Sequence, residues 1–594
     1  MLKNKLKEKF DIDLENISEM GRNDNQGLID IFLTIITSRS EIGKSGFPII
    51  EPRGYESFLQ NIPHLFKNGQ VILNLIKIIR DRIEDIQEIS RNECQSVIRV
   101  LEILNRVILT SSVTAPPDLW VIRHLISSMM NSTLKNYVSN ENWFNLNDIT
   151  KIEKLDLNQL KYMFGFLFSR GYLRHKKEGS SNLYFFSDLE FLNSCNALAP
   201  NLPQNVIPSF VNALSKEEDL NKIESFLKID LNLSKSKTWI ATWNEVEVGF
   251  RFLPFVLALR YLDKNRELIC GSNILAHELK LTPSMLTLCK LAGAINENNE
   301  VTLLGERMFL RGPGPYGIIH AYYPYMEKHL QLLQKNKQKM WVARGENVAA
   351  SQDANARSFQ KINQAIDQFC NDFNYKFNVF IEHAVGYGEA TRQRLILSGE
   401  KEIQYFGADL EQSAIEKAME GKEQGKLPQN MKFIGNADIG SPNVLIQGIL
   451  EAGFNTQNAM MVVGNGFHEV RNQTNDKMVN IFKEYSKSGI IIAFTEESGL
   501  RDEDLLLTGW NTYHAGFKFM HNISGQGLRP ALDIHDSKDE NPQFSWKKCA
   551  ELGNYRVLNE YTNRTRSIFP YKGKNGYNPS ISVNYFCVPV SLKF

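Results

Sequence analysis

The last 240 or so residues alternate short apolar segments with segments of helical periodicity, and this alternation constrains the fold more than any other feature. The segment 378–397 (NVFIEHAVGYGEATRQRLIL) contains an apolar strand, a glycine-containing turn and a helix, in that order. The same succession continues to the end of the chain. Strands that alternate with helices are typical of a parallel sheet with helices on its faces.

Seven strands are predicted in this part of the chain. The last two follow one helix, SWKKCAEL, so that the chain ends in a pair of strands without a helix between them. We therefore predict an α/β domain over residues 341–594 with a seven-stranded sheet. The segments that carry the strands are 378–397, 402–410, 431–439, 459–473, 489–498, 545–567 and 579–594.

The turn after the first predicted strand has the features of a nucleotide site. Gly386 and Gly388 allow the backbone to approach a ligand, although only G-x-G of the longer G-x-G-x-x-G fingerprint is present. Asp409 ends the second strand, 23 positions after Gly386, where a carboxylate can accept hydrogen bonds from both ribose hydroxyls. Asp438 ends the third strand and can receive an adenine amino group. These residues suit NAD and S-adenosylmethionine equally.

Composition excludes several classes of protein. The net charge is +1, from 68 basic and 67 acidic residues, which does not favour nonspecific nucleic-acid binding. Seven scattered cysteines without a C-x-x-C pair indicate a reducing compartment and no thiolate zinc site. No signal peptide and no run of 18 apolar residues is present, so we expect a cytoplasmic protein without a membrane span.

The first 340 residues are predicted to be mainly helical. The segment 69–89 places apolar side chains on one helix face. Two later segments suggest winged-helix-like units, the first with a wing in GYLRHKKEGSSNLYFFS and the second with a helix capped by Thr282, a wing and a tight glycine turn in RGPGPYG. We predict a helical scaffold or dimerisation region over 1–140, a winged-helix-like and helical segment over 141–240, and a second such segment with a lid over 241–340, with boundaries near Pro116-Pro117 and between Pro200 and Pro208.

Taken together, these features resemble the class I S-adenosylmethionine-dependent methyltransferases. The closest likeness within that class is to the metal-dependent methyltransferase domains of apratoxin-type polyketide loading modules, and it lies in EHAVGYG (382–388), GNGFHEV (464–470) and GWNTYH (509–514). The terminal strand pair looks like the antiparallel edge of that class's Rossmann-like, seven-stranded sheet. The resemblance implies S-adenosyl-L-methionine as cofactor. It also implies a small molecule or a carrier-bound acyl thioester as acceptor, since those domains methylate the α-carbon of a malonyl thioester.

Candidate catalytic residues follow from the chemistry of methyl transfer. An oxygen or carbon nucleophile needs a base, and histidine is the usual choice because it titrates near neutrality. His468 follows the fourth strand, while His514 and His521 lie after the fifth, in an aromatic segment expected to cover the site. We predict His468, His514 and Glu469 as catalytic. For each histidine the alternative is a purely structural side chain.

The predicted cofactor contacts lie around the glycine turn and at the ends of the strands: Glu382, Gly386, Gly388, Asp409, Leu410, Asp438, Ile439 and Asn465. Arg344, Asn347 and Gln352, on a preceding helix, can reach the cofactor carboxylate. The likeness also implies a metal ion. His468 and His514, with Glu496 or Glu469, would form a two-histidine, one-carboxylate set suited to Fe or Mn, which can stabilise an enolate during carbon methylation.

Three functions remain open at this stage. The first is methylation of a small molecule or acyl thioester at carbon or oxygen. The second is methylation of a protein or another macromolecule, with the N-terminal half used for docking; nucleobases are disfavoured because Gly464-Asn-Gly-Phe replaces an Asn-Pro-Pro-Tyr motif after the fourth strand. The third is a binding module that has kept the fold without catalysis. A homodimer through the N-terminal region is compatible with each of them.

Overall fold

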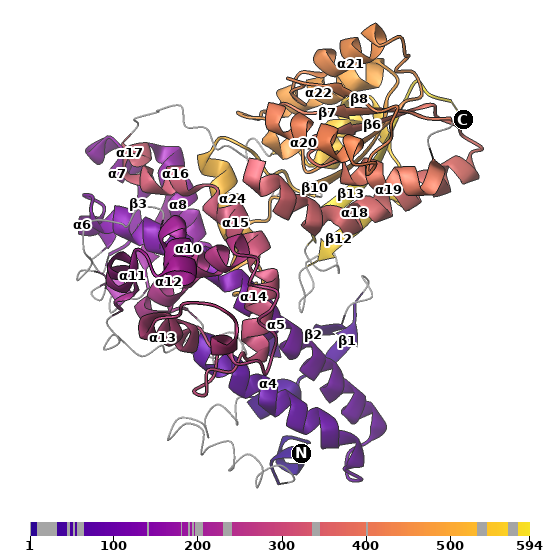
Figure 1. Cartoon of the computed structure of the whole chain (residues 1–594). Helices are drawn as coiled ribbons and strands as arrows, with labels where there is room; N and C mark the ends of the chain where they lie inside the picture. The colour runs from indigo at the N-terminus through magenta and orange to yellow at the C-terminus, as the bar shows by residue number, and fades with distance from the viewer. Residues whose placement is uncertain are drawn as a thin grey trace. The chain divides into compact units, whose positions relative to one another are not determined.

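The structure is a computed structural model (Figure 1). It describes residues 2–8, 32–43, 48–51, 54–55, 65–138, 142–179, 181–187, 191–192, 195, 206–229, 240–334, 345–399, 402–531, 543–567 and 580–593. Two compact units are present. The helical unit contains the described residues up to 334 together with Arg501–Phe519, and the α/β unit contains those of 345–500, 520–567 and 580–593.

The α/β unit is built on one mixed sheet. Its strand order is β11-β13-β10-β9-β6-β7-β8, and β12 also pairs with β13. The five strands from β10 to β8 are parallel, whereas β13 runs antiparallel to β10, β11 and β12. The strands are β6 (Val379–His383), β7 (Gln404–Ala408), β8 (Lys432–Ile434), β9 (Met460–Gly464), β10 (Ile491–Glu497), β11 (Tyr555–Val557), β12 (Asn563–Ser567) and β13 (Ser580–Pro589).

The sheet has eight strands, so the predicted count of seven is corrected. The segment 545–567, expected to hold one strand, holds both β11 and β12, with the short 3-10 helix η4 (Asn559–Tyr561) between them. Both pair with β13, which has ten residues and therefore accommodates β12 at its start and β11 at its end. The expected antiparallel closing edge is present.

Helices cover both faces of the sheet, because successive side chains of a buried parallel strand point to opposite faces and both must be apolar. In β6, Val379 and Ile381 join one core cluster and Phe380 joins the other. Figure 1 shows these helices around the sheet. The first face carries α21 (Pro442–Glu451), α22 (Asn475–Lys487) and α25 (Trp546–Leu552), and the second carries α18 (Gly345–Asp372), α19 (Glu389–Ser398) and α20 (Gln412–Glu423).

The direction in which the chain adds strands reverses at β6. This strand pairs with β7 on one side and with β9 on the other. In open α/β sheets, ligands bind beyond the carboxyl ends of the strands at such a reversal. The turns that follow β6, β7, β8 and β9 are therefore the part of the fold that can hold a cofactor.

The helical unit is organised around α5 (Arg91–Met130), whose 40 residues pack chiefly against α12 (Trp243–Tyr261). Pro116 and Pro117 lie inside α5, so the predicted domain boundary at this position is wrong. A proline within a helix costs about 3 kcal/mol because it removes a backbone donor. Here every residue from Ser111 to Met129 is buried, and that burial offsets the cost. The predicted helix in 69–89 is confirmed as α4 (Leu65–Arg82).

The first predicted wing is present as the hairpin of β4 (Leu173–Glu178) and β5 (Ser181–Phe186), and β3 (Phe144–Asn145) extends it on the β5 side. Thr282 caps α13 (Pro283–Leu291) as expected. The second wing forms only isolated bridges, such as Ile295 with Val301. The predicted glycine turn in RGPGPYG is instead helical, since proline suits the first turn of α15 (Pro313–His320). The winged-helix assignment itself stays a prediction.

The remaining elements of the helical unit are β1 (Ser40–Ile42), β2 (Pro48–Ile50), η1 (Ile83–Asp85), α6 (Lys135–Val138), α7 (Leu146–Glu153), α8 (Leu157–Ser169), α10 (Ile207–Lys216), α11 (Leu220–Leu227), η2 (Ile274–Ala276), α14 (Leu303–Arg311), α16 (Tyr323–Glu327), α17 (His329–Leu333) and α23 (Asp502–Leu506). One helix, α24 (His514–Ile523), has residues in both units. Among the described residues, no helix is long and apolar enough to cross a membrane.

Candidate cofactor and catalytic site

The turn between β6 and α19 has a backbone that few side chains tolerate. Ala384, Gly386 and Gly388 all have positive φ, at 60°, 49° and 76°. A Cβ on Gly388 would lie 2.8 Å from the Leu427 side chain, so glycine is required there by both conformation and space. This turn leads directly into the N-terminus of α19, where the helix dipole favours anions.

Glu382 stabilises this turn by accepting hydrogen bonds from the start of α19. Its buried carboxylate accepts hydrogen bonds from the backbone N–H groups of Ala390 and Thr391, at 3.1 and 2.7 Å. Burial raises the pKa of Glu382 to about 7, against the opposing effect of these hydrogen bonds. The carboxylate thus holds the first turn of α19, and its predicted contact with the cofactor stays a prediction.

Asp409 joins the ends of two strands. One carboxylate oxygen accepts from the backbone N–H of Gly386 at 3.2 Å and the other from that of Glu411 at 3.0 Å. Burial raises the pKa of Asp409 above its ordinary value, and the backbone donors partly oppose this. The residue is still partly exposed, so its oxygens retain lone pairs for a ligand. Leu410, the next residue, is 42% exposed and offers an apolar surface beside it.

The turn after β8 lies beside the end of β7, close to Asp409. The backbone N–H of Ala437 donates to the Asp409 carbonyl at 3.0 Å, which ties this turn to the end of β7. Asp438 is partly exposed, and its Oδ1 accepts from the Gly440 N–H at 2.7 Å. Ile439 is buried. A carboxylate at this position is available to a donor such as an adenine amino group.

The turn after β9 completes the arrangement. A Cβ on Gly466 would lie 3.0 Å from Ile439 and 3.4 Å from Ala384, so the turns after β6, β8 and β9 meet here. Asn465 adopts φ 55°, and its Nδ2 donates to Asn355 of α18 at 3.2 Å. Its Oδ1 is buried without a hydrogen-bond partner among the described residues. A buried acceptor of this kind indicates a site for a donor that the chain itself does not supply.

His468 and Glu496 form a buried pair next to this turn. The Nδ1 of His468 lies 2.7 Å from Oε2 of Glu496, and Glu496 is fully buried at the end of β10. The other oxygen of Glu496 accepts from the backbone N–H groups of Phe467 and His468, at 2.5 and 3.3 Å. These bonds orient the imidazole and place its proton on Nδ1 in the neutral form, which leaves the lone pair on Nε2.

Two further residues flank the pair. Oε1 of Glu469 lies 3.3 Å from Nε2 of His468, and the ring of His521 packs edge-on against His468 with 4.9 Å between centroids. Gln526 donates to the other oxygen of Glu469 at 2.5 Å. When His468 carries a second proton, both of its N–H groups therefore have a carboxylate acceptor.

His514 lies in the helical unit, where it begins α24. It is 2% exposed, its backbone N–H donates to Thr512 at 3.1 Å, and its ring stacks on Phe517. The predicted metal ligands are thus divided between the units, with His468 and Glu496 bonded to each other in the α/β unit. Within the described ranges, no group of three or more His, Cys, Asp or Glu side chains is placed to hold a metal ion. The Fe or Mn prediction gains no support.

One part of this site was not anticipated. Glu496 was predicted only as a metal ligand, and its bond to His468 Nδ1 depends on the register that places Thr495 of β10 beside Gly464 of β9. His383 is structural: its Nε2 lies 2.9 Å from the Ala437 carbonyl and burial lowers its pKa to about 4. Arg344 and the side chains of Asn347 and Gln352 lie outside the described residues.

Comparison with known proteins gives a likeness of fold. No protein-family model matches the sequence, and no curated protein does. Solved structures similar to this chain include methyltransferases. An O-methyltransferase family protein from Burkholderia thailandensis is 12% identical with a TM-score of 0.36, over 58% of this chain and 96% of that one.

Two carbon methyltransferases are also similar. The CurJ carbon methyltransferase is 9% identical with a TM-score of 0.34, over 89% of this chain and 100% of that one. The CMeT domain of the citrinin polyketide synthase is 13% identical with a TM-score of 0.29, over 65% of this chain and 95% of that one. All three TM-scores lie below 0.5, so we base the function on the geometry of the site.

Proposed function

We propose that this chain is an S-adenosylmethionine-dependent methyltransferase that acts on a small molecule or an acyl thioester. One observation carries the proposal: a sheet edge with the features of a nucleoside site also carries an oriented imidazole. Asp409, Asp438 and Asn465 follow β7, β8 and β9 at the strand reversal. In the pair, His468 also follows β9, and Glu496 lies at the end of β10.

The residues at this edge fit the cofactor group by group. Asp409 offers carboxylate oxygens to ribose hydroxyls, and Asp438 offers one to an adenine amino group. The unpartnered Oδ1 of Asn465 is an acceptor suited to the ammonium group of the methionine part. The turn around Gly386 and Gly388 lets the backbone approach closely. When bound, S-adenosylmethionine supplies an electrophilic methyl group on its sulfonium.

His468 is the proposed base. Glu496 holds the proton of the neutral imidazole on Nδ1, so Nε2 accepts the proton that the acceptor loses as its oxygen or carbon attacks the methyl group. The negative charge of Glu496 stabilises the imidazolium that results. In this assignment Glu496 is a positioning residue, and Glu469 stabilises the same ion from the Nε2 side. His514 stays a candidate from sequence alone.

The class of acceptor that we propose follows from the presence of a general base. Transfer to an amine needs little assistance, whereas phenols and the α-carbon of a thioester must lose a proton during attack, and a buried imidazole with a carboxylate partner meets that need. We therefore favour carbon or oxygen acceptors over nitrogen.

Cofactor binding tests the proposal most directly. Isothermal titration of wild-type protein with S-adenosylhomocysteine should show one site. Asp409→Ala and Asn465→Gly should each weaken binding by roughly 10- to 100-fold, as loss of hydrogen bonds to a polar ligand predicts; glycine keeps the positive φ of Asn465 accessible. Asp476→Ala, an exposed aspartate of α22, is the matched control. Absence of binding to the wild-type protein would contradict the proposal.

Acceptor use is tested separately. Methyl-labelled S-adenosylmethionine is incubated with a malonyl thioester, with small phenols and with cell protein, each with and without a chelator. Transfer to either of the first two supports the proposal, and transfer only to protein would favour the macromolecular alternative. Chelator sensitivity that is reversed by Fe or Mn would restore the metal prediction.

A further inference from the structure

The segment Arg501–Phe519 belongs to a different unit from the residues before and after it in the sequence. The chain leaves the α/β unit after β10, forms this segment as part of the helical unit, and returns to the α/β unit at Met520. The segment contains α23, the loop with Trp510, and His514. This segment contacts α5 and α8, and these contacts show how the first half of the chain fixes its conformation.

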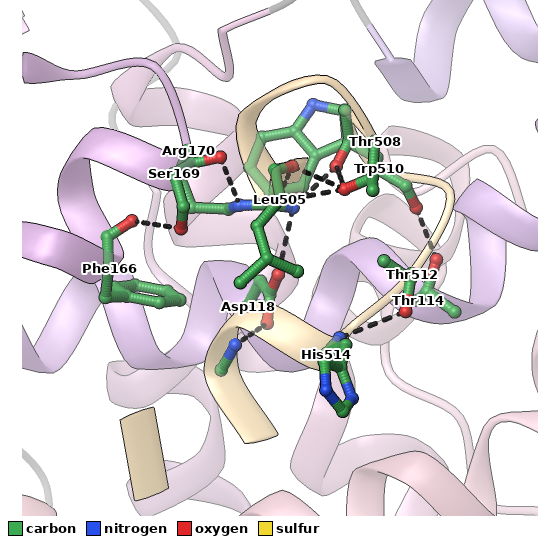
Figure 2. A network of polar contacts seen from close by, with 12 residues as sticks. Thr114, Asp118, Phe166, Ser169, Arg170, Leu505, Thr508, Trp510, Thr512 and His514 are labelled. Atoms are coloured by element: carbon green, nitrogen blue, oxygen red, sulfur yellow. Dashed lines mark hydrogen bonds and ion pairs between the residues drawn. The ribbon is translucent and has the colours of Figure 1, made fainter. Parts of the chain in front are cut away.

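Arg170, at the end of α8, is the centre of these contacts (Figure 2). Its Nη1 donates to the Gly509 carbonyl at 2.5 Å, and its Nη2 donates to the Leu505 carbonyl at 2.8 Å and to Thr508 Oγ1 at 3.2 Å. The guanidinium also lies over the Trp510 ring at 5.4 Å. The planar guanidinium therefore specifies the backbone path from Leu505 to Trp510.

Two residues of α5 hold the next part of the segment. Thr114 Oγ1 donates to the Trp510 carbonyl, and Asp118 Oδ1 accepts from the backbone N–H of Gly516 at 3.0 Å. A Cβ on Gly516 would lie 2.4 Å from that oxygen, so the contact requires glycine. Asp118 thereby occupies an N-terminal N–H group of α24.

Asp118 and Arg170 also pair with each other, at 3.2 Å, and both side chains are fully buried. Burial raises the pKa of Asp118 to about 7, although Arg170 opposes this. A buried pair gains little stability over apolar residues of the same size, since desolvation offsets the attraction. The pair is better explained by what it specifies, namely one conformation of Arg501–Phe519.

The same anchoring extends along α24. This helix has ten residues; its first turn is held by Asp118 in the helical unit, and its last turn carries His521, which packs against His468 in the α/β unit. A single continuous helix thus connects the Asp118 contact to the neighbour of the proposed base.

We propose that Arg170 and Asp118 are positioning residues for methyl transfer: by fixing Arg501–Phe519 they set the position of α24, and through His521 the orientation of His468. This rests on the proposed function. It assigns the helical unit a part in the reaction, rather than a role only as a scaffold or docking module.

The test uses the full chain and three variants. Arg170→Lys keeps the charge but loses the planar donor array, and Thr114→Val removes only the hydroxyl that bonds the Trp510 carbonyl. Arg123→Lys is the matched control, because Arg123 is also buried, in α5, and pairs with Glu247 of α12. Backbone amide hydrogen exchange is measured over residues 505–523, together with S-adenosylhomocysteine affinity and the pH profile of methyl transfer.

In Arg170→Lys we expect exchange to accelerate roughly tenfold or more over 505–516 and also over 520–523, with cofactor affinity within about twofold of wild type. The rate of transfer should fall and the pH profile should shift, and the control should change neither. Thr114→Val should show the same pattern to a smaller extent, and serves if Arg170→Lys does not fold. Faster exchange that stops at residue 516, or an unchanged pH profile with wild-type transfer, would overturn the inference. Failure of wild-type protein to bind the cofactor would instead contradict the proposed function.

Discussion

At the scale of single residues, the buried histidines His468 and His383 differ in their hydrogen-bond partners. His468 has a carboxylate on Nδ1 and another near Nε2, whereas His383 bonds a carbonyl and the Tyr485 hydroxyl. Only the first arrangement places a carboxylate beside each ring nitrogen. Such environments, rather than residue type, distinguish a base from a structural side chain.

The first prediction concerns this pair. His468→Gln should lower kcat by roughly 100- to 10,000-fold, since it removes the general base, and Glu496→Gln by a smaller factor, since it removes the charge that stabilises the imidazolium. S-adenosylhomocysteine affinity should stay near that of wild type. Single-turnover transfer from labelled cofactor measures the first effect and titration the second. A change in the β4–β5 hairpin of the helical unit, His175→Gln, is the control; equal turnover in His468→Gln and in the control would remove His468 as the base.

A second prediction concerns His329 in α17. Its ring is fully buried, neither nitrogen has a hydrogen-bond partner among the described residues, and burial lowers its pKa to about 3. The unfolded chain, with a histidine pKa of about 6.5, takes up the proton first as pH falls, so folding stability declines below pH 6.5.

Between pH 7 and pH 5 this one group should lower the free energy of unfolding by about 2 kcal/mol, from 1.36 kcal/mol per pH unit. His329→Phe, which keeps a ring beside Phe519, should lose that part of the pH dependence. Urea unfolding of both proteins at the two pH values measures it. The raised pKa of Asp118 acts with the opposite sign but is common to both proteins, so it cancels. The same pH dependence in both would contradict the assignment.

At the scale of elements, the turn between β6 and α19 combines two constraints that can be separated. Gly388 and Gly425 both have φ near 70°. A Cβ on Gly388 would meet the side chain of Leu427, whereas a Cβ on Gly425 would meet no neighbouring atom. The same substitution therefore introduces left-handed strain at both sites, but crowding only at Gly388.

The third prediction compares them. Gly425→Ala should cost about 1–2 kcal/mol of stability through left-handed strain alone, with cofactor affinity unchanged. Gly388→Ala should cost more, because Leu427 must also move, and it should weaken S-adenosylhomocysteine binding because the turn itself shifts. Denaturant unfolding and titration measure the two effects. Equal affinity in both variants would show that this turn does not contact the cofactor.

At the scale of the whole molecule, the two units cannot be separated by one cut in the chain, because Arg501–Phe519 belongs to the helical unit. Trp510, Phe517 and Phe519 of this segment are buried there. A fragment that keeps the segment but lacks its partners would expose these aromatic side chains to water.

The fourth prediction follows. Residues 341–594 expressed alone should aggregate or bind the dye ANS, whereas the same fragment with 501–519 replaced by a flexible glycine-serine linker should stay monomeric and bind S-adenosylhomocysteine without methyl transfer. Size-exclusion chromatography and titration distinguish the two. Full transfer activity in the linker fragment would show that the helical unit takes no part in the reaction.

The sequence by itself determined what depends on neighbours along the chain. Apolar alternation predicted the strands, and the glycines and Asp409 marked the turn that we propose binds the cofactor, because both signals arise from residues within one strand-turn-helix unit. It misjudged Pro116-Pro117 and RGPGPYG, where burial and a helix start outweigh the local tendency of proline and glycine to break structure.

Only the tertiary structure decided what depends on pairing across the chain. The register of β10 against β9 bonds Glu496 to His468, residues 28 positions apart. The Arg170 and Asp118 contacts join α8 and α5 to a segment more than 300 positions away. No local pattern encodes either, since each depends on which buried polar groups find partners once the cores have formed.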